Sequence, residues 1–353
     1  MTTKTETIRQ DPIKSTWRHK EKSSWTISHW FFEILNIHST ELNKEVPTHP
    51  KTDKVPYTPE WQTLRWVIVH SCIPLVIHQL YTQWSGRNFT PFQAFVFYSL
   101  AFKVIAIHQL HVFRQLGHKT GFLDGDVHER DGVPDIAVGK IVRSLLSTST
   151  FRPVMTVFLA YKTSQTPDTI NWLYLPLELS LYGIVLDFWF YWYHRLMHEV
   201  NALWEFHRTH HMTKHPNPLL TLYADFEQEF FDIIGVPFMT YASMRAMGLP
   251  MGFYEWWIAH QFVMFTELAG HSGLRIYTPP PNLVTFLLRW MDCELIIEDH
   301  DLHHRQGWKK SGNYGKQTRL WDKMFGTCLD RIEMKDGNID WTAKVDLPLV
   351  GLF

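Results

Sequence analysis

The sequence predicts an all-α fold, a multi-pass transmembrane helical bundle with a histidine-rich metal cap that faces the cytosol. Apolar, aromatic-rich runs near bilayer-spanning length recur along the chain. The polar stretches between and after these runs carry three tight groups of histidines. Aromatic residues make up 15 % of the chain and include 16 Trp, a content typical of proteins that contact the membrane interface.

The apolar runs predict three helical hairpins, 64–84 with 92–110, 145–161 with 172–193, and 230–247 with 253–270. The first hairpin turns at SGRNFTP and the third at GLPMG, which are polar or rich in Gly and Pro. Each run is near the length that crosses a bilayer, although most carry a charge or a histidine. The alternative is a soluble all-helical protein with aromatic core helices.

Composition divides the chain into three parts. Residues 1–60 form a polar N-terminal tail without the apolar core of a secretory signal, residues 61–330 a membrane-embedded domain, and residues 331–353 a C-terminal tail. The formal net charge is −1, so no nucleic-acid partner is expected. The three cysteines form no CxxC, which argues against a disulfide framework or a thiolate zinc site.

The hairpins place the histidine groups on one side of the membrane. Each hairpin crosses the bilayer an even number of times, so a cytosolic N-terminus puts 111–144, 194–229 and 271–353 on the same face. The last segment carries a basic stretch, which the positive-inside rule favours in the cytoplasm. This stretch comprises Arg305, Lys309, Lys310, Lys316, Arg319 and Lys323.

Three histidine motifs predict a metal site. HRLMH at 194–198 places its two histidines one turn apart on one helix face. HRTHH at 207–211 and HDLHH at 300–304 share the spacing HxxHH, and two copies would arise by chance only on the order of a few times in a thousand such sequences. The candidate ligands are His194, His198, His207, His210, His211, His300, His303 and His304.

This donor set favours two iron ions over catalytic zinc. A zinc hydrolase typically uses three protein ligands and leaves one position open, and the sequence has no HExxH. Two iron ions held by neutral imidazoles, with space left for dioxygen, fit the larger number of candidate histidine ligands. The alternative from another class is a non-catalytic membrane protein whose histidines hold a structural or transported metal.

The last apolar run adds a polar helix face. His260, Glu267 and His271 recur at i, i+7 and i+11, and ionisable residues within a membrane helix indicate function. The alternative is a polar stripe that is satisfied between helices. His215, close to the second motif, is left without a definite role.

The three motifs in this order resemble the sterol desaturase/fatty acid hydroxylase superfamily, whose pattern reads HxxxH, HxxHH and a late HxxHH. The likeness runs from Asp187 to Thr327. DFWFYWYHRLMH is similar to the first motif with its aromatic lead-in, and WEFHRTHH is similar to the second. HDLHH, followed by NYG and WDKMFGT, resembles the third.

The resemblance implies an integral membrane enzyme of the endoplasmic reticulum with a non-haem diiron centre. Such enzymes use dioxygen to hydroxylate or desaturate an unactivated lipid C–H bond, with electrons from NAD(P)H through cytochrome b5 and its reductase. The sequence lacks the HPGG of a fused cytochrome b5, so an external donor is expected. Hydroxylation of a fatty acyl or sphingoid chain is the leading hypothesis for the reaction, and sterol desaturation and sterol methyl oxidation are the alternatives. The oligomeric state stays open.

Two acidic residues depart from the family pattern. Asp225 stands where relatives often have a histidine, and Glu267 where some have one a turn before His271. We expect both to act as oxygen ligands or as partners of the ligands, and Asp299 and Asp301 to accept imidazole N–H groups. With the resemblance, the expected metal ligands are His194, His198, His207, His210, His211, His271, His300, His303 and His304.

Overall fold

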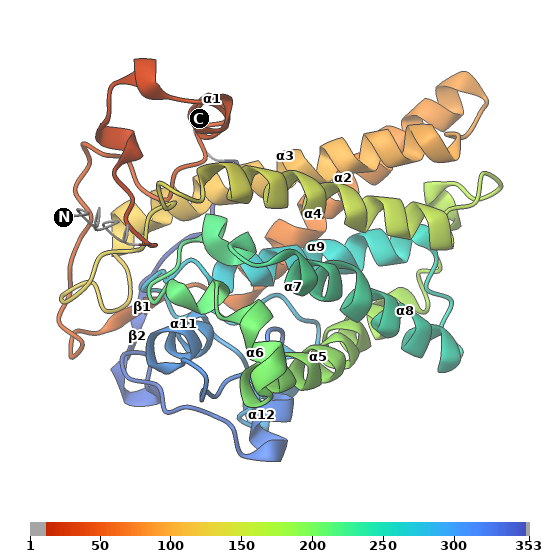
Figure 1. The fold of residues 1–353 in the computed structure, drawn as a ribbon. Coiled ribbons are helices and arrows are strands. Elements are labelled where there is room, and N and C mark those ends of the chain that lie inside the picture. The colour runs from red at the N-terminus through yellow and green to blue at the C-terminus, as the bar shows by residue number, and fades with distance from the viewer. Residues whose placement is uncertain (1–11, 351–353) are drawn as a thin grey trace.

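A computed structural model describes residues 12–350, and this part of the chain is mostly helical, as predicted (Figure 1). Each apolar run of the sequence corresponds to a helix. These are α2 (Glu60–Ser85), α3 (Pro91–Thr120), α4 (Val138–Ala160), α5 (Leu175–Glu199), α8 (Val236–Ala246) and α9 (Phe253–Gly270). The run before α8 begins as α7 (Phe226–Phe230) and continues through a π-helical turn, Phe231–Gly235.

The turn between α2 and α3 follows from its residues. α2 ends at Gly86, whose φ of 66° lies in the left-handed region that glycine adopts without strain. Thr90 then caps α3, because its hydroxyl accepts the Gln93 N–H while the Gln93 side chain accepts the Thr90 N–H. Pro91 occupies the first helical position, where no donor is needed.

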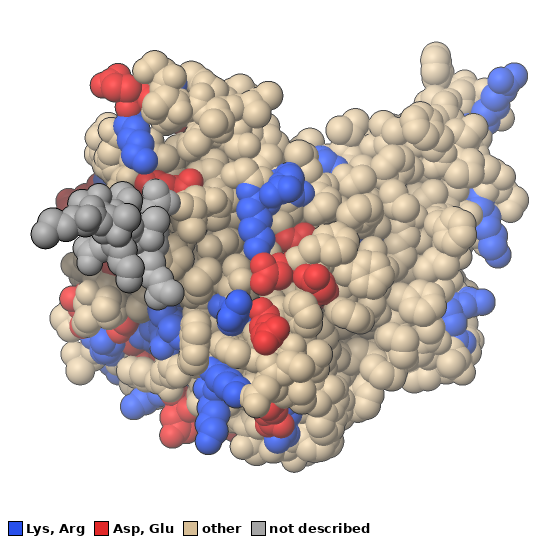
Figure 2. Space-filling model, in the orientation of Figure 1, with Lys and Arg blue, Asp and Glu red and all other residues tan. Residues whose placement is uncertain are grey.

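Among the described residues, two helices are long and apolar enough to cross a membrane, α2 and α3. Their outward faces are exposed and apolar, with Ile73, Val76, Ile77, Leu80 and Trp84 on α2 and Phe92, Val96, Leu100 and Val104 on α3. Figure 2 shows charged side chains gathered over the left half of the molecule and few towards the hairpin tips at the right. Apolar surface of this extent indicates a membrane contact.

Helix α9 is the centre of the bundle. Its residues from Phe253 to Thr266 are all buried, and α2, α3, α4 and α5 pack around it. A helix that is apolar on every side can lie within a protein core as well as within lipid. Here protein, not lipid, surrounds α9 over most of its length.

The remaining elements close one end of the bundle. Strand β1 (Val55–Tyr57) pairs in parallel with β2 (Ile339–Lys344). Helix α1 (Ile27–Ile34) packs on α4, and the side chains of Trp17 and Phe32 beside it are buried. The short helices are α6 (Asn201–His207), α10 (Thr285–Trp290), α11 (Ile297–Gln306) and α12 (Leu320–Phe325). The polar segments that follow α3, α5 and α9 therefore meet at the end opposite the hairpin tips (Figure 1).

Arg275, with its buried ion pair and hydrogen bonds, links three stretches that are far apart in the chain, and its loss should be costly. Arg275 Nε donates to Glu333 Oε2 at 2.9 Å, and its other nitrogens donate to the carbonyls of Asp53 and Lys54. Arg275→Met would leave the Glu333 carboxylate buried without its cation. We expect it to lower the free energy of unfolding by about 3–5 kcal/mol, read from denaturant unfolding in detergent.

Lys323→Met is the control for this substitution. Lys323 forms an exposed ion pair with Asp292, so its loss should cost at most about 1 kcal/mol. Equal losses for the two variants would contradict the structural importance of the buried pair.

Candidate metal centre

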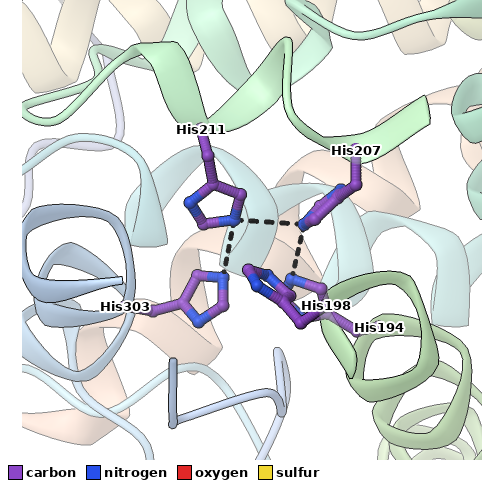
Figure 3. Close-up of side chains that lie close together, drawn as sticks. All are labelled: His194, His198, His207, His211 and His303. Atoms are coloured by element: carbon purple, nitrogen blue, oxygen red, sulfur yellow. Dashed lines mark hydrogen bonds between the residues drawn. The ribbon is translucent and has the colours of Figure 1, made fainter. Parts of the chain in front are cut away.

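Nine histidines converge in the interior at the polar end of the bundle, in two groups. The five-histidine group comprises His194, His198, His207, His211 and His303 (Figure 3). The four-histidine group comprises His210, His271, His300 and His304. Within each group, one ring nitrogen of every residue lies within 4.8 Å of all the others, and every residue is buried. The structure thus brings together all nine histidines that the sequence predicted as ligands.

Each HxxHH motif serves both groups because neighbouring residues of a helix point about 100° apart. His211 faces the five-histidine group while His210 faces the four-histidine group. On α11, His303 belongs to the first group, and His300 and His304 belong to the second. The spacing therefore builds two adjacent sites from the same short segments.

Backbone carbonyls fix the tautomer of five of these rings. A carbonyl oxygen can only accept, so the ring nitrogen that faces it must carry the hydrogen. Each Nδ1 then donates, and each Nε2 keeps its lone pair. The bonds are His194 to Tyr314 at 2.8 Å, His198 to Trp308 at 2.8 Å, His271 to Glu267 at 2.9 Å, His303 to Gly312 at 2.7 Å and His304 to Thr213 at 3.0 Å.

The Nε2 atoms point at one another. In the five-histidine group, Nε2 of His207 lies 3.1 Å from Nε2 of His194 and of His211, and His211 lies 3.1 Å from His303 (Figure 3). In the other group, His271 lies 3.3 Å from His210 and 3.0 Å from His300. Nitrogens bound at about 2.1 Å to one ion, at right angles, would be roughly 3 Å apart.

Protonation of the rings does not explain why these Nε2 atoms lie so close together, because the rings are buried and neutral. Burial, followed by the neighbouring imidazoles, lowers the pKa of His211 and His304 well below the ordinary histidine value. Burial, followed by His303, lowers the pKa of His207 to about 3. The Nε2 atoms of His198 and His304 have no hydrogen-bond partner among the described residues. Neutral imidazoles whose Nε2 atoms converge, two of them without a hydrogen-bond partner, fit a metal cation in each group.

A buried loop carries two of the carbonyl acceptors. Asp187 on α5 accepts the backbone N–H groups of Lys316, Gln317 and Thr318, and Asp322 accepts those of Tyr314 and Gly315. Both carboxylates are buried. They fix the loop whose carbonyls hold His194 and His303. The sequence motifs DFWFYWYHRLMH, NYG and WDKMFGT contain Asp187, Tyr314 and Asp322, but their spacing in the chain does not show that they meet.

Glu267 lies beside the four-histidine group but is bound by cations. Its Oε1 accepts from Arg152 at 2.8 Å and from Lys316 at 2.7 Å, and Lys316 also donates to Asp232 at 2.6 Å. Asp225 belongs to neither group; it pairs with Lys140 at 2.6 Å and accepts from the Thr209 hydroxyl at 2.8 Å.

Asp299 and Asp301 bind arginines. Asp299 pairs with Arg331 at 2.8 Å, and Asp301 pairs with Arg130 at 2.6 Å. The expectation that they orient imidazoles is not met by any contact in the described part of the chain, where backbone carbonyls take that role.

Two further histidines lie outside both groups. His260 is buried near Tyr182 and Trp256. His215 Nε2 lies 2.9 Å from Asp124 Oδ2, and this carboxylate already pairs with Lys51 and Arg305. The acidic partner of His215 is therefore neutralised by side chains.

A narrow cavity of about 40 Å³ reaches both histidine groups. His194 and His207 line it from one group, and His210, His271 and His300 from the other. The rest of the lining combines apolar and aromatic side chains, such as Phe190 and Leu295, with the paired Lys316, Glu267 and Asp232.

The chain is similar to proteins named for the oxidation of lipids. A family model described as fatty acid hydroxylase matches residues 179–327. A fatty acid hydroxylase, vlmA from Lecanicillium sp, is 44 % identical over 322 residues, 87 % of each chain. Alkylglycerol monooxygenase from Xenopus tropicalis is 28 % identical over 58 % of this chain and 42 % of its own. Methylsterol monooxygenase 2-1 from Arabidopsis thaliana is 26 % identical over 59 % of this chain and 79 % of its own. No solved structure matches the chain.

His303→Ala should remove metal from the purified protein. This ring faces His211 and is fixed by the Gly312 carbonyl, so its loss removes one of five convergent nitrogens. We expect the metal content, measured by elemental mass spectrometry, to fall by up to half as the five-histidine group empties. His70→Ala, a buried histidine outside both groups, is the control and should keep the full content. Equal metal content in the two variants would count against the assignment.

The Glu267→Gln variant tests whether Glu267 binds metal or only pairs with Arg152 and Lys316. If its charge serves mainly Arg152 and Lys316, the variant should retain its metal while losing thermal stability. If the carboxylate binds metal, the content should fall as it does in His303→Ala. Metal content and the unfolding midpoint of one preparation decide between these roles.

Proposed function

Because the chain belongs to the sterol desaturase/fatty acid hydroxylase superfamily, we propose that it is an iron-dependent, dioxygen-using membrane oxidoreductase. Its reaction is hydroxylation of an unactivated C–H bond in a fatty acyl or sphingoid chain. The observation that carries the proposal is the convergence of neutral imidazole Nε2 atoms in two adjacent buried groups. A site for one zinc ion would need about three ligands and one such group.

The five-histidine and four-histidine groups would each hold one iron ion, since imidazole suits iron. When bound, the ions supply the activation of dioxygen and the cleavage of the C–H bond. The chain's own residues orient the site. The carbonyls of Gly312 and Tyr314 hold two rings with Nε2 directed inward, and the tight cavity limits the water that enters.

The lining of the cavity supports an uncharged substrate segment. Lys316 is paired with both Glu267 and Asp232, so these three side chains offer no free charge to the substrate. The apolar and aromatic part of the lining, such as Phe190 and Leu295, suits an acyl segment. Likeness to methylsterol monooxygenase keeps sterol oxidation as the second candidate.

Hydroxylation places one oxygen atom of dioxygen in the C–H bond and releases the other as water. The balance requires two electrons and two protons, and we propose NAD(P)H as the electron source, through external cytochrome b5 and its reductase. We further propose that the protein is a multi-pass protein of the endoplasmic reticulum, with the histidine groups on the cytosolic side. The two apolar helices and the gathering of charge at one end support this orientation.

Lipid mass spectrometry of cells with and without the protein tests the reaction. Expression together with cytochrome b5 should add one oxygen atom to an acyl or sphingoid lipid; loss of two hydrogen atoms would identify a desaturase. His207→Ala should reduce the product by more than about 100-fold, because even an outer partner of a metal ligand is worth 10–100-fold.

His70→Ala controls for the loss of a buried histidine outside both groups, and it should keep most of the activity. Oxidation of sterols alone would favour the second candidate. Full product formation by His207→Ala, or by iron-free protein, would overturn the proposal.

A further inference from the structure

Helix α1 has an exposed apolar face. Its inner face is anchored by Phe32, which is fully buried in a cluster with Trp17, Leu219 and Leu220. The opposite face carries Ile27, Trp30 and Ile34, which are 87, 38 and 76 % exposed. These three residues recur at i, i+3 and i+7 and therefore lie on one side of the helix.

The surroundings of this face have the composition of a membrane interface. Trp25 and Trp30 pack edge to face, with ring centroids 5.4 Å apart. Lys22 Nζ lies 5.3 and 5.7 Å from the two ring centroids and also pairs with Glu33. Tryptophan with an adjacent lysine is typical of the boundary where one end of a side chain is apolar and the other hydrated.

The position of α1 continues the exposed apolar surface of the bundle. α1 packs against α4, whose exposed side chains include Phe151, Val154 and Phe158. In Figure 1, α1 lies in a lobe above the bundle, at the end opposite the hairpin tips. Figure 2 shows a hollowed outline between this lobe and the tips. A bilayer that surrounds α2 and α3 would fill this hollow and meet the lobe at its surface.

We propose that α1 is an interfacial helix that lies on the bilayer surface at the polar end of the bundle, with Ile27, Trp30 and Ile34 among the head groups and upper acyl chains. Helix α1 is too short to anchor the protein in the membrane alone. Its effect is on the depth and the tilt of the protein in the bilayer. Asp135 holds the segment by accepting the N–H groups of Thr16 and Trp17. The cluster around Phe32 includes Leu219 and Leu220, so α1 packs against the segment that follows the second histidine motif.

Spin labels on the full-length protein in phosphatidylcholine nanodiscs test this placement. Cys72, Cys293 and Cys328 are first changed to Ser, and a nitroxide is then placed at Ile27→Cys or Ile34→Cys. Power-saturation spectroscopy compares oxygen, which partitions into lipid, with a water-soluble nickel chelate. We expect the oxygen-to-nickel accessibility ratio at both positions to exceed that at Asp336→Cys, an exposed polar control far from α1 in the chain, several-fold.

A label at Val76→Cys on α2 provides the membrane reference, because Val76 is 55 % exposed on a candidate span. A lipid-like ratio there with a water-like ratio on α1 would overturn the interfacial placement and leave the membrane span intact. Labels on α1 that neither reagent reaches would indicate a second copy or another protein, which also overturns it. None of these outcomes depends on catalysis.

Unmodified protein provides a second measurement if the cysteine-free variant does not fold. A lipid-soluble diazirine should label the peptide that contains Ile27, Trp30 and Ile34 as it labels α2, when peptides are read by mass spectrometry. Label on α2 with none on the α1 peptide would contradict the proposal.

Discussion

The structure depends on one electrostatic constraint, the convergence of uncharged imidazole nitrogens in a dry interior. Lone pairs about 3 Å apart repel one another unless a hydrogen or a cation lies between them. Burial disfavours the protonated form of these rings, as the lowered pKa of His211 and His304 shows. A cation in each group would remove the conflict, and the remaining features of the polar end hold the rings where such a cation would bind.

Carboxylates organise this end indirectly. Asp187 and Asp322 gather the N–H groups of one loop and leave its carbonyls to accept from His194 and His303. Glu298 on α11 holds a further backbone segment, beyond α12, by accepting the N–H groups of Glu333 and Met334. The main chain, which sequence changes alter least, thereby sets the tautomers of the rings.

Much of this arrangement was predictable from the sequence. Helical spacing places His207 and His211 on one face, and the turn residues of SGRNFTP fix the first hairpin. The environments of Glu267 and Asp225 were not predictable, because Arg152, Lys316 and Lys140 come from distant segments. The lengths of the apolar runs alone also did not distinguish α9, which protein surrounds, from α2 and α3, whose outward faces are exposed.

The sequence by itself determined the helical class and the three histidine motifs with their order, because these follow from local periodicity and residue chemistry, whereas His271 joined the expected ligands through the family resemblance. The tertiary structure decided how the nine histidines divide into groups of five and four, since His210 and His211 turn to different neighbours only when α11 packs beside them. It also decided which carboxylates meet cations and which hold the backbone. Those outcomes depend on contacts between segments far apart in the chain, such as Asp187 with the N–H groups of Lys316 and Thr318, and local spacing carries no information about them.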